Sequence, residues 1–108
     1  MSKIPPLDEL GRFSDVSLLV LISLASGPKH GYAMMEDIAT FSGVDLEPGS
    51  LYGAITRLER RGWIESLPAE ERRRPYRLSS VGVTVLREQL STLESVTVTL
   101  RQRLAPQG

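Results

Sequence analysis

The chain has 108 residues, and its 13 basic and 13 acidic residues give a net charge of zero. This length predicts one domain with a modest core, and the absence of cysteine together with a single histidine excludes disulfides, a thiolate nucleophile and Cys or His metal clusters. Because no apolar run approaches the roughly 20 residues that span a bilayer and the first residues lack a signal-peptide core, we expect a cytoplasmic protein without a membrane partner.

The first 13 residues contain Pro5 and Pro6 and show no helical period. We interpret them as an N-terminal arm, in which Ile4 and Leu7 pack on the body or on a partner chain, or as a disordered segment.

Two helices are predicted next. Ser14 is a favourable N-cap for a dense aliphatic run over residues 16–24, which we expect to be buried on most sides. Gly31 is placed to cap a second helix, over about residues 32–41, that Gly43 ends. Its inward-facing side chains are predicted to be Met34, Met35, Ile38 and Phe41.

The stretch over residues 48–61 has two faces that differ in character. The apolar stripe at helical spacing consists of Leu51, Ala54, Ile55 and Leu58. The opposite face is small, polar and basic, with Gly49, Gly53, Thr56 and Arg60, flanked by Arg57 and Tyr52. A glycine in a helix interior costs about 1 kcal/mol relative to alanine, so Gly53 on an exposed turn indicates a large partner close to the backbone. We interpret that partner as DNA.

A charged hairpin is predicted after this helix. Trp63, Ile64 and Leu67 suggest one short strand and residues 75–78 a second, with the sequence PAEERRR between them. Residues 57–77 hold seven arginines against four glutamates, so a basic patch lies on an otherwise acidic chain. Such a patch is suited to polyanions.

A final helix is predicted from Ser79 or Ser80 to about Leu104, some 38 Å long at 1.5 Å per residue. A heptad-like leucine seam runs along it: Leu86, Leu90, Leu93, Thr97, Leu100 and Leu104. The β-branched residues 96–99 are weak helix formers, so we expect this segment to need a partner, most simply a second copy of the chain.

Three stretches resemble the PadR family of bacterial transcriptional regulators in order and spacing. They are KHGYAM (residues 29–34), PGSLY continuing through RLERRGWI (residues 48–64) and RRRPYRLSSVG (residues 72–82). The resemblance covers about residues 14–104. It implies a mainly α fold with a small β-hairpin, a winged helix-turn-helix followed by a long dimerisation helix, which binds operator DNA as a homodimer, commonly as a repressor released by a ligand.

The resemblance also implies boundaries and site residues. Residues 1–13 would be the arm, residues 14–78 the DNA-binding domain and residues 79–105 the dimerisation helix. Carried over by position, residues 48–61 would be the recognition helix and residues 72–74 the wing tip. The candidate DNA-binding residues are Gly49, Ser50, Tyr52, Gly53, Thr56, Arg57, Arg60, Arg72, Arg73 and Arg74. Tyr52 either contacts a phosphate or packs at the edge of the core.

Two features depart from the family pattern. The wing tip has no glycine, which leaves its turn conformation open, and the last helix has no tryptophan of the kind on which some relatives stack flat aromatic ligands. If a small-molecule effector binds, we expect it in the dimer cleft between the last and first helices, with Thr97 and Ser91 as polar lining.

Competing interpretations remain at this point. Arg60 and Arg61 would form a solvated face paired with nearby glutamates, and residues 72–74 a disordered charged loop, if the helix face does not bind DNA. A winged-helix module for protein partners is the alternative function, favoured by the zero net charge. We expect no enzyme, cofactor or metal, because no nucleophile elbow, phosphate loop, acid–base pair or metal cluster is present.

Overall fold

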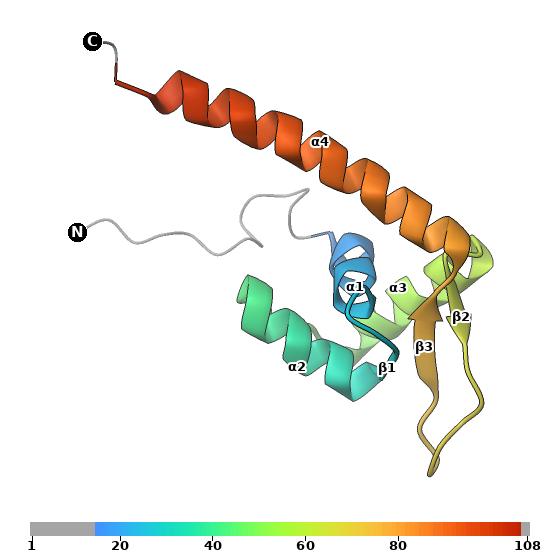
Figure 1. The fold of residues 1–108 in the computed structure, drawn as a ribbon. Coiled ribbons are helices and arrows are strands. Elements are labelled where there is room, and N and C mark those ends of the chain that lie inside the picture. The colour runs from blue at the N-terminus through green and yellow to red at the C-terminus, as the bar shows by residue number, and fades with distance from the viewer. Residues whose placement is uncertain (1–14, 107–108) are drawn as a thin grey trace.

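The computed structural model describes residues 15–106 as four helices and a three-stranded sheet (Figure 1). The elements are α1 (Val16–Leu24), β1 (Lys29–His30), α2 (Gly31–Ser42), α3 (Pro48–Arg60), β2 (Ile64–Ser66), β3 (Pro75–Leu78) and α4 (Ser80–Leu104). The sheet is antiparallel in the order β1-β3-β2. This confirms the predicted fold class. The predicted arm lies outside the described residues.

Helix α1 spans the predicted run, but its N-cap lies one residue later than predicted. Its N-cap is Asp15, whose carboxylate accepts a hydrogen bond from Leu18 N at 3.2 Å, so the assignment of the N-cap to Ser14 was wrong; Ser14 itself lies outside the described residues. The helix is buried on most sides, as expected, and its buried side chains are Leu19, Val20, Leu21, Ser23 and Leu24. It packs against α2 and α3 and is the centre of the core.

Helix α2 is capped by His30 rather than by Gly31. The His30 Nδ1 atom accepts from Ala33 N at 3.4 Å, and Gly43 ends the helix with a φ of 75°, as predicted. Met34 and Ile38 are buried, but Phe41 is 43% exposed, which contradicts its predicted inward position. Phe41 lies in the last turn of α2, at the end of the helix that projects beyond α1 in Figure 1.

The start of α4 is tied to the end of α3 by backbone contacts. Ser79 is the N-cap, accepting from Gly82 N at 3.0 Å, while its own backbone N donates to Trp63 O at 3.0 Å and its hydroxyl donates to Gly62 O at 2.5 Å. A Cβ atom placed on Gly82 would lie 1.9 Å from Trp63 O. The SSVG sequence therefore allows the backbones of α4 and the α3–β2 turn to touch.

The second half of α4 leaves the body of the protein. In Figure 1 the helix crosses one side of the molecule, and the β2–β3 hairpin points away from it. Every described residue after Leu93 is exposed. No helix within residues 15–106 has the length and apolar character needed to cross a membrane.

Candidate nucleic-acid interface

The outer face of α3 is open. Its stripe of Leu51, Ala54, Ile55 and Leu58 is buried as predicted. The opposite face is exposed except at Gly53, which is half-buried. A Cβ atom on Gly49 would meet nothing within 4 Å, and one on Gly53 would meet only the Arg57 side chain at 3.5 Å. Packing within the described chain therefore does not require either glycine.

The remaining predicted residues of this face are all exposed but differ in their hydrogen bonds within the helix. Ser50 and Arg60 are exposed. Thr56 is exposed as well, but its hydroxyl proton is used inside the helix, where it is donated to Tyr52 O at 2.9 Å. Thr56 therefore presents its methyl group and hydroxyl lone pairs outward.

Tyr52 packs against a neighbouring helix end rather than in the core. It is 50% exposed, and a Cβ atom on Gly31 would lie 2.4 Å from its hydroxyl oxygen and 2.8 Å from Cζ. Only a glycine at the first position of α2 leaves room for this ring. Tyr52 therefore combines a packing contact with an exposed edge beside the start of α2.

The tip of the wing (residues 64–78) is a tight turn built without glycine. Glu70 and Arg73 form an isolated bridge with two backbone hydrogen bonds of 2.7 Å, and the residues between them, Glu71 and Arg72, have φ values of 46° and 70°. Positive φ at both central residues is the pattern of a type I′ hairpin turn. The left-handed conformation costs non-glycine residues roughly 1–2 kcal/mol each. The structure therefore gives the tip of the wing a defined tight turn.

A pocket of about 470 Å³ joins the wing to α2 and α3, and we call it the wing-side pocket. Its lining consists of His30, Gly31, Tyr32, Tyr52, Arg72, Arg73, Arg74 and Tyr76. The structure therefore brings Tyr52 and the three predicted wing arginines to one concave surface. The arrangement depends on β1, which pairs Lys29 with Tyr76 and which the sequence reasoning missed because a two-residue strand carries no periodicity.

Two polar details of the wing-side pocket follow from this packing. His30 Nε2 lies 3.3 Å from Arg73 Nη1, so the cap of α2 also contacts the wing. Burial raises the pKa of the Tyr76 hydroxyl, and the Glu59 carboxylate adds to the rise.

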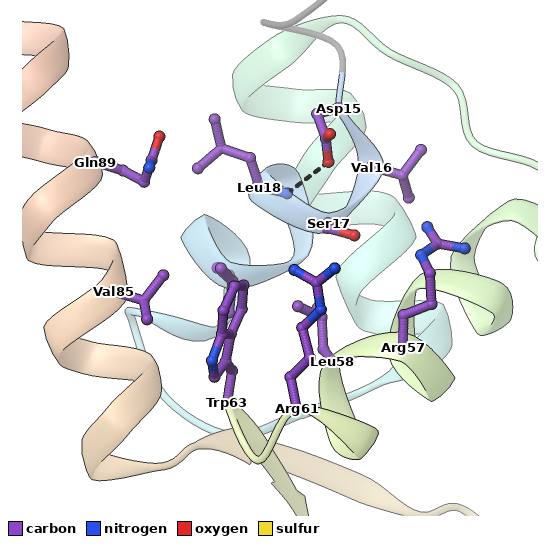
Figure 2. Close-up of a pocket in the computed structure, with 11 residues that line it drawn as sticks. Asp15, Val16, Ser17, Leu18, Arg57, Leu58, Arg61, Trp63, Val85 and Gln89 are labelled. Atoms are coloured by element: carbon purple, nitrogen blue, oxygen red, sulfur yellow. Dashed lines mark hydrogen bonds between the residues drawn. The ribbon is translucent and has the colours of Figure 1, made fainter.

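Arg57 lies on the other flank of α3, away from this pocket. It lines a pocket beside α1 together with Arg61 and Trp63 (Figure 2). The predicted set is thus divided: Tyr52 and the wing arginines lie on one flank, Arg57 lies on the other, and neither pocket includes Arg60.

The glutamate-paired alternative is not seen for these arginines. Within residues 15–106 the ion pairs are Lys29–Asp37 and Arg77–Glu65, the second at 3.0 Å across β2 and β3. Of the seven arginines in the basic patch, only Arg77 is held by a carboxylate in this part of the chain. The other six form no ion pair with a carboxylate of residues 15–106.

The predicted seam of α4 is exposed along most of its length. Leu90 is 55%, Leu100 54% and Leu104 74% exposed, whereas Leu86 packs against the core. An apolar groove of about 550 Å³ between α1 and α4 is lined by residues that include Ile22, Leu86, Leu90 and Leu93. Thr97 and Ser91, predicted to line an effector cleft, are exposed on α4 and do not line this groove.

One family model matches most of the chain, and several known proteins are similar to it. The model of the Transcriptional regulator PadR-like family matches residues 19–88, more than half of the chain. A 37.1 kDa protein in a transposon of Streptomyces fradiae is 42% identical over 82 residues, which are 76% of this chain and 24% of that protein. The chain therefore spans about a quarter of the length of this relative.

Solved structures give the same result. A PadR family transcriptional regulator from Eggerthella lenta is 29% identical with a TM-score of 0.73, covering 94% of this chain and 90% of its own. A transcriptional regulator from Clostridium thermocellum is 26% identical with a TM-score of 0.70, covering 83% and 93%. A PadR family regulator from Clostridium difficile, at 22% identity and a TM-score of 0.74 over 83% and 98%, shares the fold.

Proposed function

The chain belongs to the PadR-like family of transcriptional regulators, and we propose that it is a homodimeric repressor that binds a specific operator sequence through α3 and the wing. The observation that carries this proposal is the open outer face of α3, with small residues at Gly49, Ser50 and Gly53 and with Arg60 unpaired among the described residues. A helix with such a face fits a major groove about 12 Å wide.

Each group has a task in this proposal. Gly49, Ser50, Gly53 and Thr56 permit close approach to the groove, and Arg57 and Arg60 reach phosphates or guanine edges. The wing-side pocket, with Arg72, Arg73, Arg74 and Tyr52, accepts the sugar–phosphate backbone beside that groove. A localised surplus of positive charge supports this assignment despite the zero net charge.

The second copy is proposed to bind along the leucine seam. Exposed leucines on a helix that leaves the body of the protein, next to an apolar groove, are typical of a surface that a partner covers. Two α3 helices in a symmetric dimer would enter successive major grooves about 34 Å apart on a pseudo-palindromic site.

Selection of bound sequences from a random duplex library tests the proposal. We expect one pseudo-palindromic site to be enriched and its affinity to fall steeply with salt. Arg60→Ala should weaken binding by about 1–3 kcal/mol if Arg60 contacts a base, whereas Arg101→Ala, which removes an exposed arginine on distant α4, should leave it unchanged. Enrichment of no sequence would reject DNA binding and favour a winged-helix module for protein partners.

Repression and its release are the remaining parts of the proposal. A reporter gene placed behind the selected operator should be silenced by the wild-type chain and not by Arg60→Ala. An increase in reporter expression would instead identify an activator. Release by a small-molecule effector is the last part of the proposal, and the pocket of about 590 Å³ beside α1, which shares Arg57 with the proposed DNA contacts, supports it.

A further inference from the structure

Thr56 lies on the outer face of α3, between Gly53 one turn before it and Arg60 one turn after it. Residues three or four positions apart on a helix are neighbours, so Gly49, Gly53, Thr56 and Arg60 form one line along this face. The two glycines have no side chain, and a Cβ atom on Gly49 would meet nothing within 4 Å. Thr56 is therefore the first side chain that projects from this line.

The helix itself fixes the orientation of the Thr56 side chain. Its hydroxyl donates to Tyr52 O, four residues earlier, at 2.9 Å. This hydrogen bond holds χ1 of the threonine in one of its two helical rotamers, so the methyl group of the exposed side chain keeps one direction. A hydroxyl has a single proton, and this one is used. Thr56 can therefore accept a hydrogen bond from a base but cannot donate one.

Few base edges match such a side chain. In the major groove guanine presents two acceptors, N7 and O6, and Thr56 has no proton to offer either of them. Thymine presents its C5-methyl group, which makes apolar contacts with the methyl group of threonine. The hydroxyl oxygen remains an acceptor for the amino group of adenine or cytosine, and this competing readout would make no use of the threonine methyl.

The glycines allow a short side chain to reach a base edge. A helix with its side chains is about 10–12 Å across, which fills a major groove about 12 Å wide. The glycine-lined face is thinner, because only the Arg57 side chain approaches within 4 Å of a Cβ atom placed on Gly53. The backbone of α3 can thus lie close to the bases, where threonine reaches without the length of an arginine.

We propose that Thr56 determines sequence specificity, its methyl group contacting the C5-methyl group of one thymine in each half-site of the operator. The inference rests on the proposed function, since it requires α3 to enter the major groove. It gives Thr56 a task that differs from that of a phosphate-binding arginine, whose contact carries no sequence information. The contact depends on the methyl group and not on thymine as such, so 5-methylcytosine, methylated at the same ring position, is accepted in its place.

Replacement of thymine by uracil tests the contact, because it removes the methyl group and leaves the hydrogen-bonding atoms of the base in place. In the operator enriched from the random library, each thymine is replaced in turn at both symmetry-related positions, and binding of the full chain is measured by fluorescence anisotropy. At one position the double replacement should weaken binding about 15-fold, or about fourfold for each buried methyl group. An enriched half-site without thymine, or unchanged affinity for every uracil operator, overturns the proposal.

Two variants assign the contact to Thr56. Thr56→Ser keeps the hydroxyl group that bonds to Tyr52 O but lacks the methyl group, whereas Thr56→Val keeps the methyl group and lacks the hydroxyl. Uracil at the sensitive position should weaken binding of Thr56→Ser by less than about twofold and that of Thr56→Val by about 15-fold, as in the wild type. Circular dichroism verifies folding, and Thr56→Ala takes the place of Thr56→Ser if that variant is not folded.

The two variants can each contradict the assignment. A folded Thr56→Ser or Thr56→Ala that keeps the full effect of uracil shows that another residue contacts the thymine methyl. Loss of the uracil effect in Thr56→Val shows that the hydroxyl, and not the methyl group, reads the base. Either result overturns the proposal.

Methylated cytosine provides an independent measurement. With cytosine–guanine pairs at the sensitive position of both half-sites, 5-methylcytosine should bind the wild type about 15-fold more tightly than cytosine, and Thr56→Ser should not distinguish the two duplexes. Equal affinity of the wild type for both duplexes contradicts the inference.

The selection step separates this inference from the proposed function. If no duplex is enriched, operator binding fails and the role of Thr56 fails with it. If a site is enriched and its affinity does not depend on C5-methyl groups, operator binding stands and only the role of Thr56 is wrong.

Discussion

Helices α1 and α4 are both rich in aliphatic side chains, but they differ in what covers them. The aliphatic residues of α1 pack against α2 and α3 within the same chain, with Leu19 2% and Leu24 3% exposed. On α4 the leucine at position 100 is 54% exposed, and no described residue beyond Leu93 is covered. Packing within one chain therefore accounts for the sequence of α1, whereas the leucine seam of α4 is the surface on which we propose that a second copy binds.

The difference also separates two kinds of stability. Burial of α1 contributes to folding of the protomer at any concentration, while burial of the seam contributes only when two protomers meet. The winged-helix body and the second half of α4 should therefore respond differently to substitution and to dilution.

The largest effect is expected from charging the seam with Leu90→Lys combined with Leu100→Lys. Burying a leucine stabilises an interface by about 1.5–3 kcal/mol, and a dimer loses four of them, so it should dissociate at micromolar concentration. Sedimentation velocity measures this, with Thr84→Lys combined with Ser95→Lys, on the opposite face of α4, as a control that stays dimeric. A wild-type chain that sediments as a monomer at all concentrations would reject dimerisation through the seam of α4.

A matched pair of leucine-to-alanine substitutions comes next. Leu19→Ala should lower the free energy of unfolding by about 2–5 kcal/mol at every protein concentration, because it leaves a cavity in the core. Leu100→Ala should lower the melting temperature only where the wild type is dimeric. Thermal unfolding over a hundredfold range of concentration distinguishes the two, and equal shifts under all conditions would contradict the comparison.

Substitution at the junction between the body and α4 should lower the free energy of unfolding by less than Leu19→Ala does, but by a measurable amount. Gly82→Ala forces a Cβ atom against Trp63 O, and overpacking of this kind costs about 1–3 kcal/mol. Gly49→Ala, whose Cβ atom meets nothing, should be neutral or stabilising by up to about 1 kcal/mol. Urea denaturation at fixed protein concentration gives both values; a Gly82→Ala variant as stable as wild type would mean that α4 shifts readily on the body.

The smallest effect on stability is expected at the wing tip, which points away from α4 in Figure 1. Arg72→Gly relieves a left-handed residue and should raise the free energy of unfolding by about 1 kcal/mol or less, while removing one cation from the wing-side pocket. Operator binding should therefore weaken and its salt dependence should flatten. Unchanged DNA binding would remove Arg72 from the interface without affecting the comparison of the helices.

The sequence correctly predicted helices that have a long periodic pattern. It gave wrong positions for features that depend on a single contact, such as the helix caps. The stripe of α3, Pro48 at its start and the extent of α4 followed from periodicity and capping. The caps of α1 and α2 were each misplaced by one residue, because Asp15 and His30 also offer acceptors that local sequence cannot rank against their neighbours. The exposure of Phe41 depends on where the body ends, which is a tertiary property.

The candidate site shows the same division. The α3 face and the wing arginines are exposed, as the sequence pattern predicted. The pattern did not predict that Tyr52 and the wing arginines line one pocket while Arg57 lines another beside α1, because this depends on β1 and on the packing of α4. The sequence analysis did not use Gly31 to predict the position of Tyr52. A glycine two positions after Lys29 at a helix start indicated that a large side chain lies close, and the ring of Tyr52 occupies that space.

The contact between Ser79, Gly82 and Trp63 fixes α4 to the winged-helix body, and this limits the half-site spacing that a dimer can bind. No linker separates the DNA-binding body from α4, since β3 ends at Leu78 and α4 starts at Ser80. Rotation of one body relative to the other would have to bend α4 or break the backbone contacts at its base. In the proposed dimer, the distance and the angle between the two α3 helices should therefore be fixed. Because each inserted base pair turns the two half-sites about 34–36° out of phase, a single insertion at the operator centre should abolish binding, and an insertion of a full turn should not restore it.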